Sequence, residues 1–289
     1  MKKQIYLFAI MAIVLTACHN KGNDIIVTND GIVKPKAPEA EGFKRILFIG
    51  NNHTEYYVSA PTLFQELCNA NNQPVYVQQL TTMGVPLDKV YDTNKTEANQ
   101  NFSNRDKDGN YYDYVILQES TPIALSSLEK YRSNLKMLVE KIHVNSPDVA
   151  VYIYEGISPV SYTDSKFNEY HEEMRKNALL AMVYIKNAGL LRVGDAIKDA
   201  YDGKNGYNYL LNGKDNLRYK QNNSFLVLND GGFLQATLLY ATIFDKKPII
   251  PKKLLLTTGI EDTDCMRKQE VTKAISNPDA LLEIAFSNR

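Results

Sequence analysis

The sequence has no excess of charge of either sign, because 33 lysines and arginines are balanced by 33 aspartates and glutamates. This balance argues against binding to nucleic acid or to an anionic membrane surface. Neither a Walker loop nor a Gly-x-Gly-x-x-Gly motif is present, so no nucleotide site is expected. Tryptophan is absent, and the four histidines end at His171. No residue beyond 171 can therefore act as a histidine base.

Only the first residues form a long apolar run. Lys2 and Lys3 precede an uncharged stretch over 5–15, which has the length of a signal-peptide core and is too short to span a bilayer. The tetrapeptide Leu-Thr-Ala-Cys that ends at Cys18 resembles a lipobox. That resemblance implies a signal peptide over 1–17 and a lipid on Cys18. The alternative is an ordinary secretory signal, in which Cys18 has no role.

The next residues, 18–42, are polar and contain Pro35 and Pro38, which is typical of a flexible tether. The remaining 43–289 are expected to form one domain. We expect export and lipid anchoring in the cell envelope, and the non-acidic His19 favours the outer membrane, on its periplasmic face or at the surface. Cys68 and Cys265 form a disulfide only if the geometry of the fold permits it.

Within the domain, apolar runs of strand length alternate with helical patterns. This alternation predicts an α/β fold with a parallel sheet covered on both faces. Ser59 is expected to cap the first helix, with Pro61 in its first turn. Expected strands lie at 45–50, 75–80, 112–118, 149–154 and 190–193. A first helix is expected to begin at Ser59. Further helices are expected over 126–142, where Ser126 and Glu129 form a capping box, over 166–187, where Gly189 is the C-cap, and over 232–244. Two more are expected after 262.

Ligands of open parallel sheets bind beyond the carboxyl ends of the strands, so residues 50–57, 81–90 and those after 117 should meet in one crevice. These segments resemble the conserved blocks of the SGNH (GDSL-like) hydrolases, in the branch whose first block reads Gly-Asn-Ser. The blocks that carry the resemblance are Gly50-Asn51-Asn52, Gly84, Leu117-Gln118-Glu119 and Leu228 to Leu234.

The resemblance implies a three-layer α/β/α, flavodoxin-like fold with a mostly parallel five-stranded sheet, and esterase chemistry by a Ser-His-Asp triad. This sequence departs from the family at each reacting position. Asn52 stands where the nucleophilic serine is expected, and Ser224 and Val227 stand at the aspartate and histidine positions. Two oxyanion positions, Gly84 and Gln118, are kept.

A rearranged site is the alternative. His53 could activate Ser59 or Ser120, with Glu55 or Glu119 as its partner, provided that these groups lie within hydrogen-bond distance. His171 is followed by two glutamates but has no second histidine at the zinc-binding spacing, so we expect it on the solvated face of its helix. No metal and no cofactor are expected.

The segment 201–223 is rich in tyrosine, asparagine, glycine and lysine, and it is expected either to wall the crevice or to be a solvated loop. The leading hypothesis is an inactive descendant of an esterase that binds a glycan or an acylated glycan. Its contacts would include Asn52, Gln118, His53, Tyr207 and Tyr209. The alternatives are an active carbohydrate or lipid esterase with a rearranged site, and a structural envelope protein. Protein partners and oligomeric state stay open.

Overall fold

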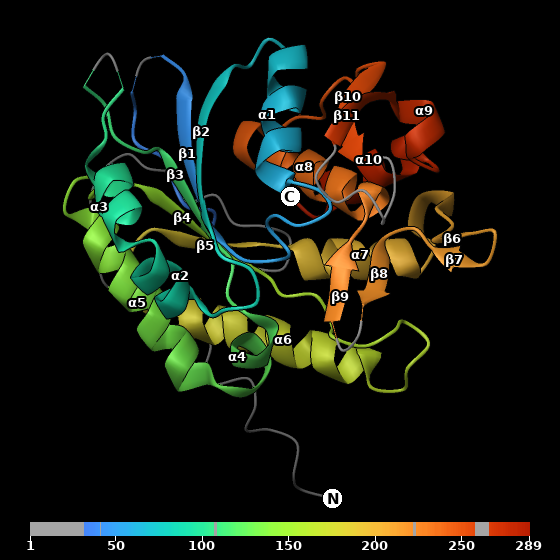
Figure 1. Cartoon of the computed structure of the whole chain (residues 1–289), viewed down its shortest axis with the longest axis horizontal. Coiled ribbons are helices and arrows are strands. Elements are labelled where there is room, and N and C mark those ends of the chain that lie inside the picture. Colours follow the sequence, from blue (N-terminus) through green and yellow to red (C-terminus); the bar gives the residue numbers. More distant parts are fainter. Residues whose placement is uncertain (1–31, 41, 107–108, 222–223, 258–265) are drawn as a thin grey trace, which may run out of the picture.

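The computed structural model describes residues 32–289 except 41, 107–108, 222–223 and 258–265. Its centre is a five-stranded parallel sheet with the order β2-β1-β3-β4-β5 (Figure 1). The expected α/β fold and five-stranded parallel sheet are confirmed. The strands are β1 (Lys44–Gly50), β2 (Val75–Thr81), β3 (Tyr114–Leu117), β4 (Ala150–Tyr154) and β5 (Ala188–Leu191).

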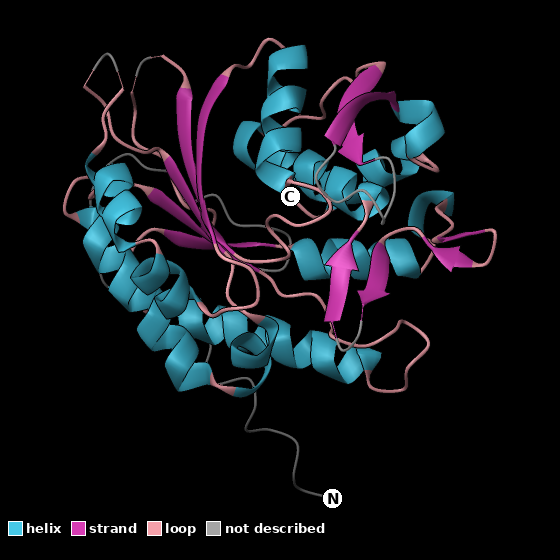
Figure 2. Ribbon diagram, in the orientation of Figure 1, coloured by secondary structure: helices cyan, strands magenta, loops and turns pink. Residues whose placement is uncertain are grey.

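Helices cover both faces of this sheet (Figure 2). In β1, Ile46 and Phe48 pack into one buried cluster, whereas Leu47 and Ile49 pack into the other. Successive strand residues point to opposite faces, so burial on both faces explains the uninterrupted apolar run. On one side lie α2 (Leu87–Thr93), α3 (Lys95–Ser103), α4 (Thr121–Ser126), α5 (Leu128–His143) and α6 (Phe167–Met182); on the other lie α1 (Ala60–Ala70), α7 (Val193–Tyr201), α8 (Asn229–Phe244) and α10 (Pro278–Ser287).

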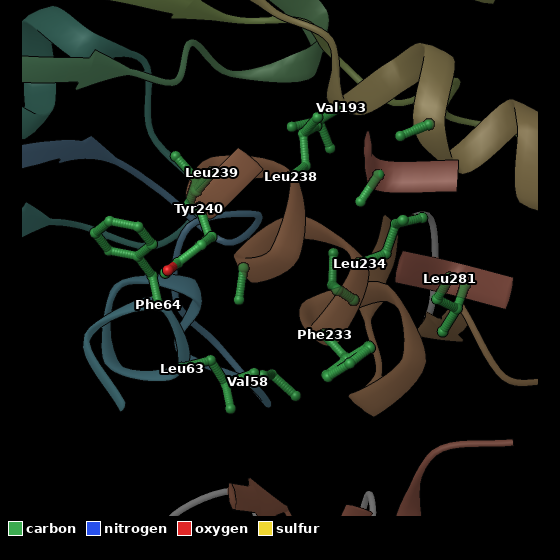
Figure 3. Packing of buried hydrophobic residues seen from close by; sticks show 14 of the residues in the cluster. Val58, Leu63, Phe64, Val193, Phe233, Leu234, Leu238, Leu239, Tyr240 and Leu281 are labelled. Atoms are coloured by element: carbon green, nitrogen blue, oxygen red, sulfur yellow. The ribbon is translucent and has the colours of Figure 1, made fainter. Parts of the chain in front are cut away.

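Helix α8 is the centre of the second layer. It is buried along most of its length, which explains why its sequence is apolar on all sides. Figure 3 shows Phe64 of α1 on one side of it and Leu281 of α10 on another. Gly232 permits a close approach here, because a Cβ at this position would lie 2.5 Å from Val58 Cγ1.

Several local expectations are confirmed and others are wrong. Ser59 caps α1 by accepting a hydrogen bond from the Thr62 N–H. The Ser126/Glu129 capping box is wrong, since α4 ends at Ser126 and Ser127 is the N-cap of α5. Helix α6 ends at Met182, and Gly189 lies in β5 instead of capping a helix.

The tail after 262 was expected to be helical in two pieces, but a strand precedes those pieces. Strand β11 (Met266–Glu270) pairs antiparallel with β10 (Lys253–Thr257), before α9 (Val271–Ala274) and α10. The residues of β11 have good helix propensity, and pairing with a distant segment overrides it.

The segment after α7 forms two short hairpins. A 3₁₀ turn (η1, Lys204–Gly206) leads to β6 (Leu210–Leu211) and β7 (Lys214–Asp215). Strands β8 (Arg218–Gln221) and β9 (Ser224–Val227) form the second hairpin, which leads directly into α8.

Part of the expected tether is bound to the domain. The Lys36 N–H donates to Asn187 Oδ1 at 2.9 Å, and Asn187 Nδ2 donates back to the Lys36 carbonyl at 2.8 Å. Pro35 packs so closely on Gly189 that a Cβ there would lie 2.4 Å from its Cδ. The ordered domain therefore includes residues on the amino side of 43, and the sequence offered no periodicity that marks them.

The predicted lipidation site, Cys18, and the possible disulfide partner, Cys265, lie outside the described residues. Cys68 is a free, fully buried thiol, and burial raises its pKa. Among the described helices, none combines the length and the apolar character needed to cross a bilayer.

Candidate functional site

The loops after β1, β2 and β3 meet at the carboxyl edge of the sheet, as expected for parallel strands. Asn51 Nδ2 donates to the Val85 carbonyl at 3.0 Å, and the Asn51 N–H donates to Gln118 Oε1 at 2.8 Å. Residues that are distant in sequence are thereby joined into one cluster.

The most informative contact in this cluster joins Asn52 and Gly84. Asn52 Oδ1 accepts a hydrogen bond from the Gly84 N–H at 2.5 Å. Gly84 is exposed and has a φ of +73°, a left-handed conformation that glycine adopts without strain. The sequence resemblance implied that Gly84 keeps an oxyanion position and that Asn52 replaces the nucleophile. In the structure, the Gly84 N–H is bound to the Asn52 side chain.

Gln118 faces the protein interior. Its Oε1 accepts from Asn51 N–H and from Thr54 Oγ1, and its Nε2 donates to the Glu119 carbonyl at 2.6 Å. Only 1% of Gln118 is exposed, and a Cβ on Gly50 would lie 2.9 Å from its Oε1. The expected ligand contact of Gln118 is therefore wrong for this conformation, because its amide holds the loops together.

Glu119 extends the same internal network. Its carboxylate accepts hydrogen bonds from the Leu87 and Ser120 N–H groups and from Asn134 Nδ2. Burial raises its pKa, while these donors lower it. Sequence reasoning treated Glu119 as a possible triad member, but its three donors make it a positioning group for the loops.

His53 lies against the β8–β9 hairpin. Its Nε2 is 3.3 Å from the Phe225 carbonyl, and its ring centroid lies 6.4 Å from that of Tyr154. Burial, together with the nearby Arg218, lowers the pKa of His53 to about 4. Such an imidazole is neutral at pH 7 and is a poor general base.

The other members of a rearranged triad are engaged elsewhere. Glu55 accepts hydrogen bonds from Gln79 Nε2 and Thr81 Oγ1, and Ser59 caps α1. Within the described ranges, no serine hydroxyl is hydrogen-bonded to His53. The structure therefore does not bring these groups together as a catalytic set.

Ser224 and Val227 both lie in β9. Residues three apart in a strand point to opposite faces. Ser224 is exposed, whereas Val227 is 4% exposed and belongs to the core. These two positions are therefore not presented together to one site.

The two tyrosines expected to contact a ligand lie in the core or at its border. Tyr207 is 3% exposed, and its hydroxyl donates to Asp230 Oδ2 at 2.7 Å. Tyr209 is partly buried and packs edge-to-face against Tyr162 and Tyr201. Tyr207 is therefore a core residue and not part of a crevice wall.

His171 is also buried, which corrects the expectation of a solvated face. Its Nε2 lies 3.1 Å from Asp195 Oδ1, and the two residues form a group with Glu155 whose ligand atoms lie within 4.8 Å of one another. Arg175 Nη1 lies 3.1 Å from Glu155 and 2.5 Å from Asp195. The guanidinium thus supplies the positive charge that a metal ion would bring, and we derive no metal site here.

A signal for the burial of His171 was present in the sequence. His171, Met174, Ala178 and Ala181 are buried at spacings of three and four, which is one stripe of a helix. The two glutamates that follow His171 drew attention to the solvated face instead.

The sheet order 2-1-3-4-5, with a polar loop cluster at its carboxyl edge, defines a flavodoxin-like α/β/α protein. More particularly, the structure has the fold of the SGNH (GDSL-like) hydrolases. No protein-family model matches the chain, and no curated protein matches it either.

Solved structures carry this assignment. A DUF4886 family protein from Bacteroides uniformis is similar with a TM-score of 0.57 and 14% identity, over 85% of this chain and 94% of that one. A proposed SGNH hydrolase from Slackia heliotrinireducens is similar with a TM-score of 0.51 and 18% identity, over 70% of this chain and 100% of that one. A proposed GDSL-like lipase from Parabacteroides merdae is similar with a TM-score of 0.50 and 16% identity, over 72% of this chain and 100% of that one. At these identities the likeness establishes the fold.

Proposed function

We propose that this chain is an SGNH-fold lipoprotein of the cell envelope that binds a glycan or an acylated glycan without hydrolysing it. The observation that carries the proposal is the hydrogen bond from the Gly84 N–H to Asn52 Oδ1. By the sequence resemblance, Asn52 stands at the nucleophile position, and this bond engages the Gly84 N–H that an oxyanion would need.

The absence of catalysis follows from the chemistry of the remaining groups. An amide nitrogen or oxygen cannot form the acyl intermediate that a serine forms. His53 is a weak base because partial burial and the nearby Arg218 lower its pKa, and Val227 offers no proton acceptor. The rearranged-esterase alternative requires a serine hydroxyl at His53, and the contact seen there is a main-chain carbonyl.

Binding is supported by what the cluster retains. Asn52 is half-buried, and in the described part of the chain its Nδ2 donates to no other group. This amide can donate to the carbonyl of an acetyl group or to a sugar hydroxyl. The internal bonds of Gln118 and Glu119 fix the loops around it, which reduces the entropy lost on binding.

Binding and hydrolysis are separated by one experiment on the full exported chain. Acetylated xylan and its deacetylated form serve as probes, and bound polysaccharide and released acetate are both measured. We expect binding without acetate release, and at least a tenfold loss of binding in Asn52→Trp. Lys136→Trp, on the exposed face of α5, is the matched control. Acetate release that disappears in Asn52→Ala or His53→Ala contradicts the proposal.

The membrane anchor is tested separately. Metabolic labelling with a palmitate analogue is expected to label the wild-type chain and not Cys18→Ala. On fractionation, we expect the wild-type chain in the outer-membrane pellet and the Cys18→Ala variant in the soluble fraction. Retention of Cys18→Ala in the membrane would contradict lipid anchoring.

A further inference from the structure

We infer that this chain carries a second small-molecule site, for an uncharged sugar, in the cavity between the start of α8, the β6–β7 hairpin and α9. The cavity measures about 470 Å³, within the range of ligand pockets. This inference goes beyond the proposed function, because neither Asn52 nor Gly84 lines this cavity.

The walls combine apolar and polar groups in the way that suits a sugar. Leu211 and Leu228 offer surface for the C–H face of a pyranose ring. Asn216 and Thr272 add an amide and a hydroxyl that can bond to ring hydroxyls. Such a mixture of apolar surface and a few polar groups is typical of small-molecule sites.

Asn216 is a partly buried residue of the cavity wall. Its Nδ2 is buried and has no hydrogen-bond partner among the residues that the structure describes. A buried polar atom without a partner costs free energy, so this amide would gain from an acceptor that a ligand brings to it. Its backbone N–H is engaged with the Tyr209 carbonyl, which fixes the residue in the wall.

One wall of the cavity is rigid before any ligand arrives. Asn229 exchanges two hydrogen bonds with the backbone of Thr257, at 2.9 and 3.1 Å. Asp230 is held by the Tyr207 hydroxyl and by the Ser276 hydroxyl and N–H. A preformed wall loses little entropy on binding.

The charges at the cavity select an uncharged ligand. Lys273 lies at the wall, but its Nζ is 2.7 Å from Glu270 Oε2, so its charge is compensated. Asp230 is buried, and its carboxylate accepts hydrogen bonds from the Tyr207 and Ser276 hydroxyls, so its charge is also compensated. Neither a cation nor an anion therefore finds an uncompensated partner among these groups.

Calorimetric titration of the full chain with cellobiose and with chitobiose tests the inference. We expect at least one of the two to bind, with at least a tenfold loss in Ala274→Trp, which fills the cavity, and in Asn216→Leu, which removes the amide at similar volume. Lys136→Trp should bind as the wild type does, and Asn52→Trp is titrated alongside it to identify any binding at the crevice. Thermal unfolding of each variant shows that it is folded.

The outcomes separate this site from the crevice. Absence of binding to both disaccharides overturns the inference, as does binding that Ala274→Trp and Asn216→Leu leave unchanged. Binding lost in Asn52→Trp and kept in Ala274→Trp also overturns it, while supporting the crevice proposal. Loss confined to the cavity variants supports this site, whatever the xylan experiment shows for the crevice.

Discussion

The Asn52 amide oxygen accepts the Gly84 N–H at 2.5 Å, so a side chain of the loop after β1 engages the backbone of the loop after β2. This one bond links two loops that follow different strands, and it satisfies the Gly84 N–H within the protein. It also stabilises the left-handed turn at Gly84, whose φ is +73°.

Asn52→Ala should therefore destabilise the fold modestly. The Gly84 N–H is exposed and can turn to water, so we expect a loss of about 1 kcal/mol in the free energy of unfolding. Asn52→Asp keeps an acceptor oxygen and should lose less. Chemical denaturation at pH 7 measures both, and equal losses in the two variants would contradict a role for the acceptor.

Restoring the triad residues should not restore esterase activity. The variant Asn52→Ser, Ser224→Asp, Val227→His supplies the three groups, but β9 points positions 224 and 227 to opposite faces. Hydrolysis of p-nitrophenyl acetate by the triple variant should match that of the wild type. Turnover that requires all three substitutions would show that β9 rearranges.

The sequence was informative wherever a side chain is buried by its own strand or helix. The apolar run from Ile46 to Ile49 predicted β1, and the rule that ligands bind at strand ends predicted that Asn52, Gly84 and Gln118 would meet. These inferences needed only local pattern and the geometry of parallel sheets.

The rest depended on contacts between distant segments. The pairing of β8 with β9 turns Val227 into the core, and nothing in the spacing of Ser224 and Val227 distinguishes a strand from a catalytic loop. Tyr207 packs in the core, and its hydroxyl donates to Asp230, which follows both hairpins in the chain. Which polar groups find partners inside the protein is decided by tertiary structure.

His53 should titrate far below an ordinary histidine. Its pKa is lowered from 6.5 to about 4 by burial and Arg218, so the folded state holds fewer protons than the unfolded state between those values. The stability that the neutral ring contributes is complete above pH 6.5 and is lost as the pH falls towards 4. NMR titration, assigned with His53→Gln, measures this directly. A midpoint near 6.5 would contradict the buried environment.

Two buried tyrosines should respond in opposite ways to removal of their hydroxyls. Tyr131 is fully buried, and its hydroxyl has no hydrogen-bond partner within the described segments. Tyr131→Phe should be neutral or slightly stabilising. Tyr207→Phe removes a donor from buried Asp230 and should cost about 1–3 kcal/mol. Denaturant unfolding compares the two, and a larger loss for Tyr131→Phe would indicate an unrecognised partner.

Glu155 gives the fold a dependence on pH. Its carboxyl is fully buried beside Asp195, and burial, with the charge of Asp195, raises its pKa from 4.5 to about 7. The folded state therefore keeps a proton that the unfolded state has released, and stability from this group is present below pH 4.5 and lost as the pH rises through 7. Glu155→Gln cannot ionise, so its free energy of unfolding relative to that of the wild type should increase as the pH rises from 5 to 8. Glu140→Gln, an exposed control on α5, should show no such trend. If the difference between Glu155→Gln and wild type is the same at both pH values, Arg175 holds the carboxylate ionised throughout.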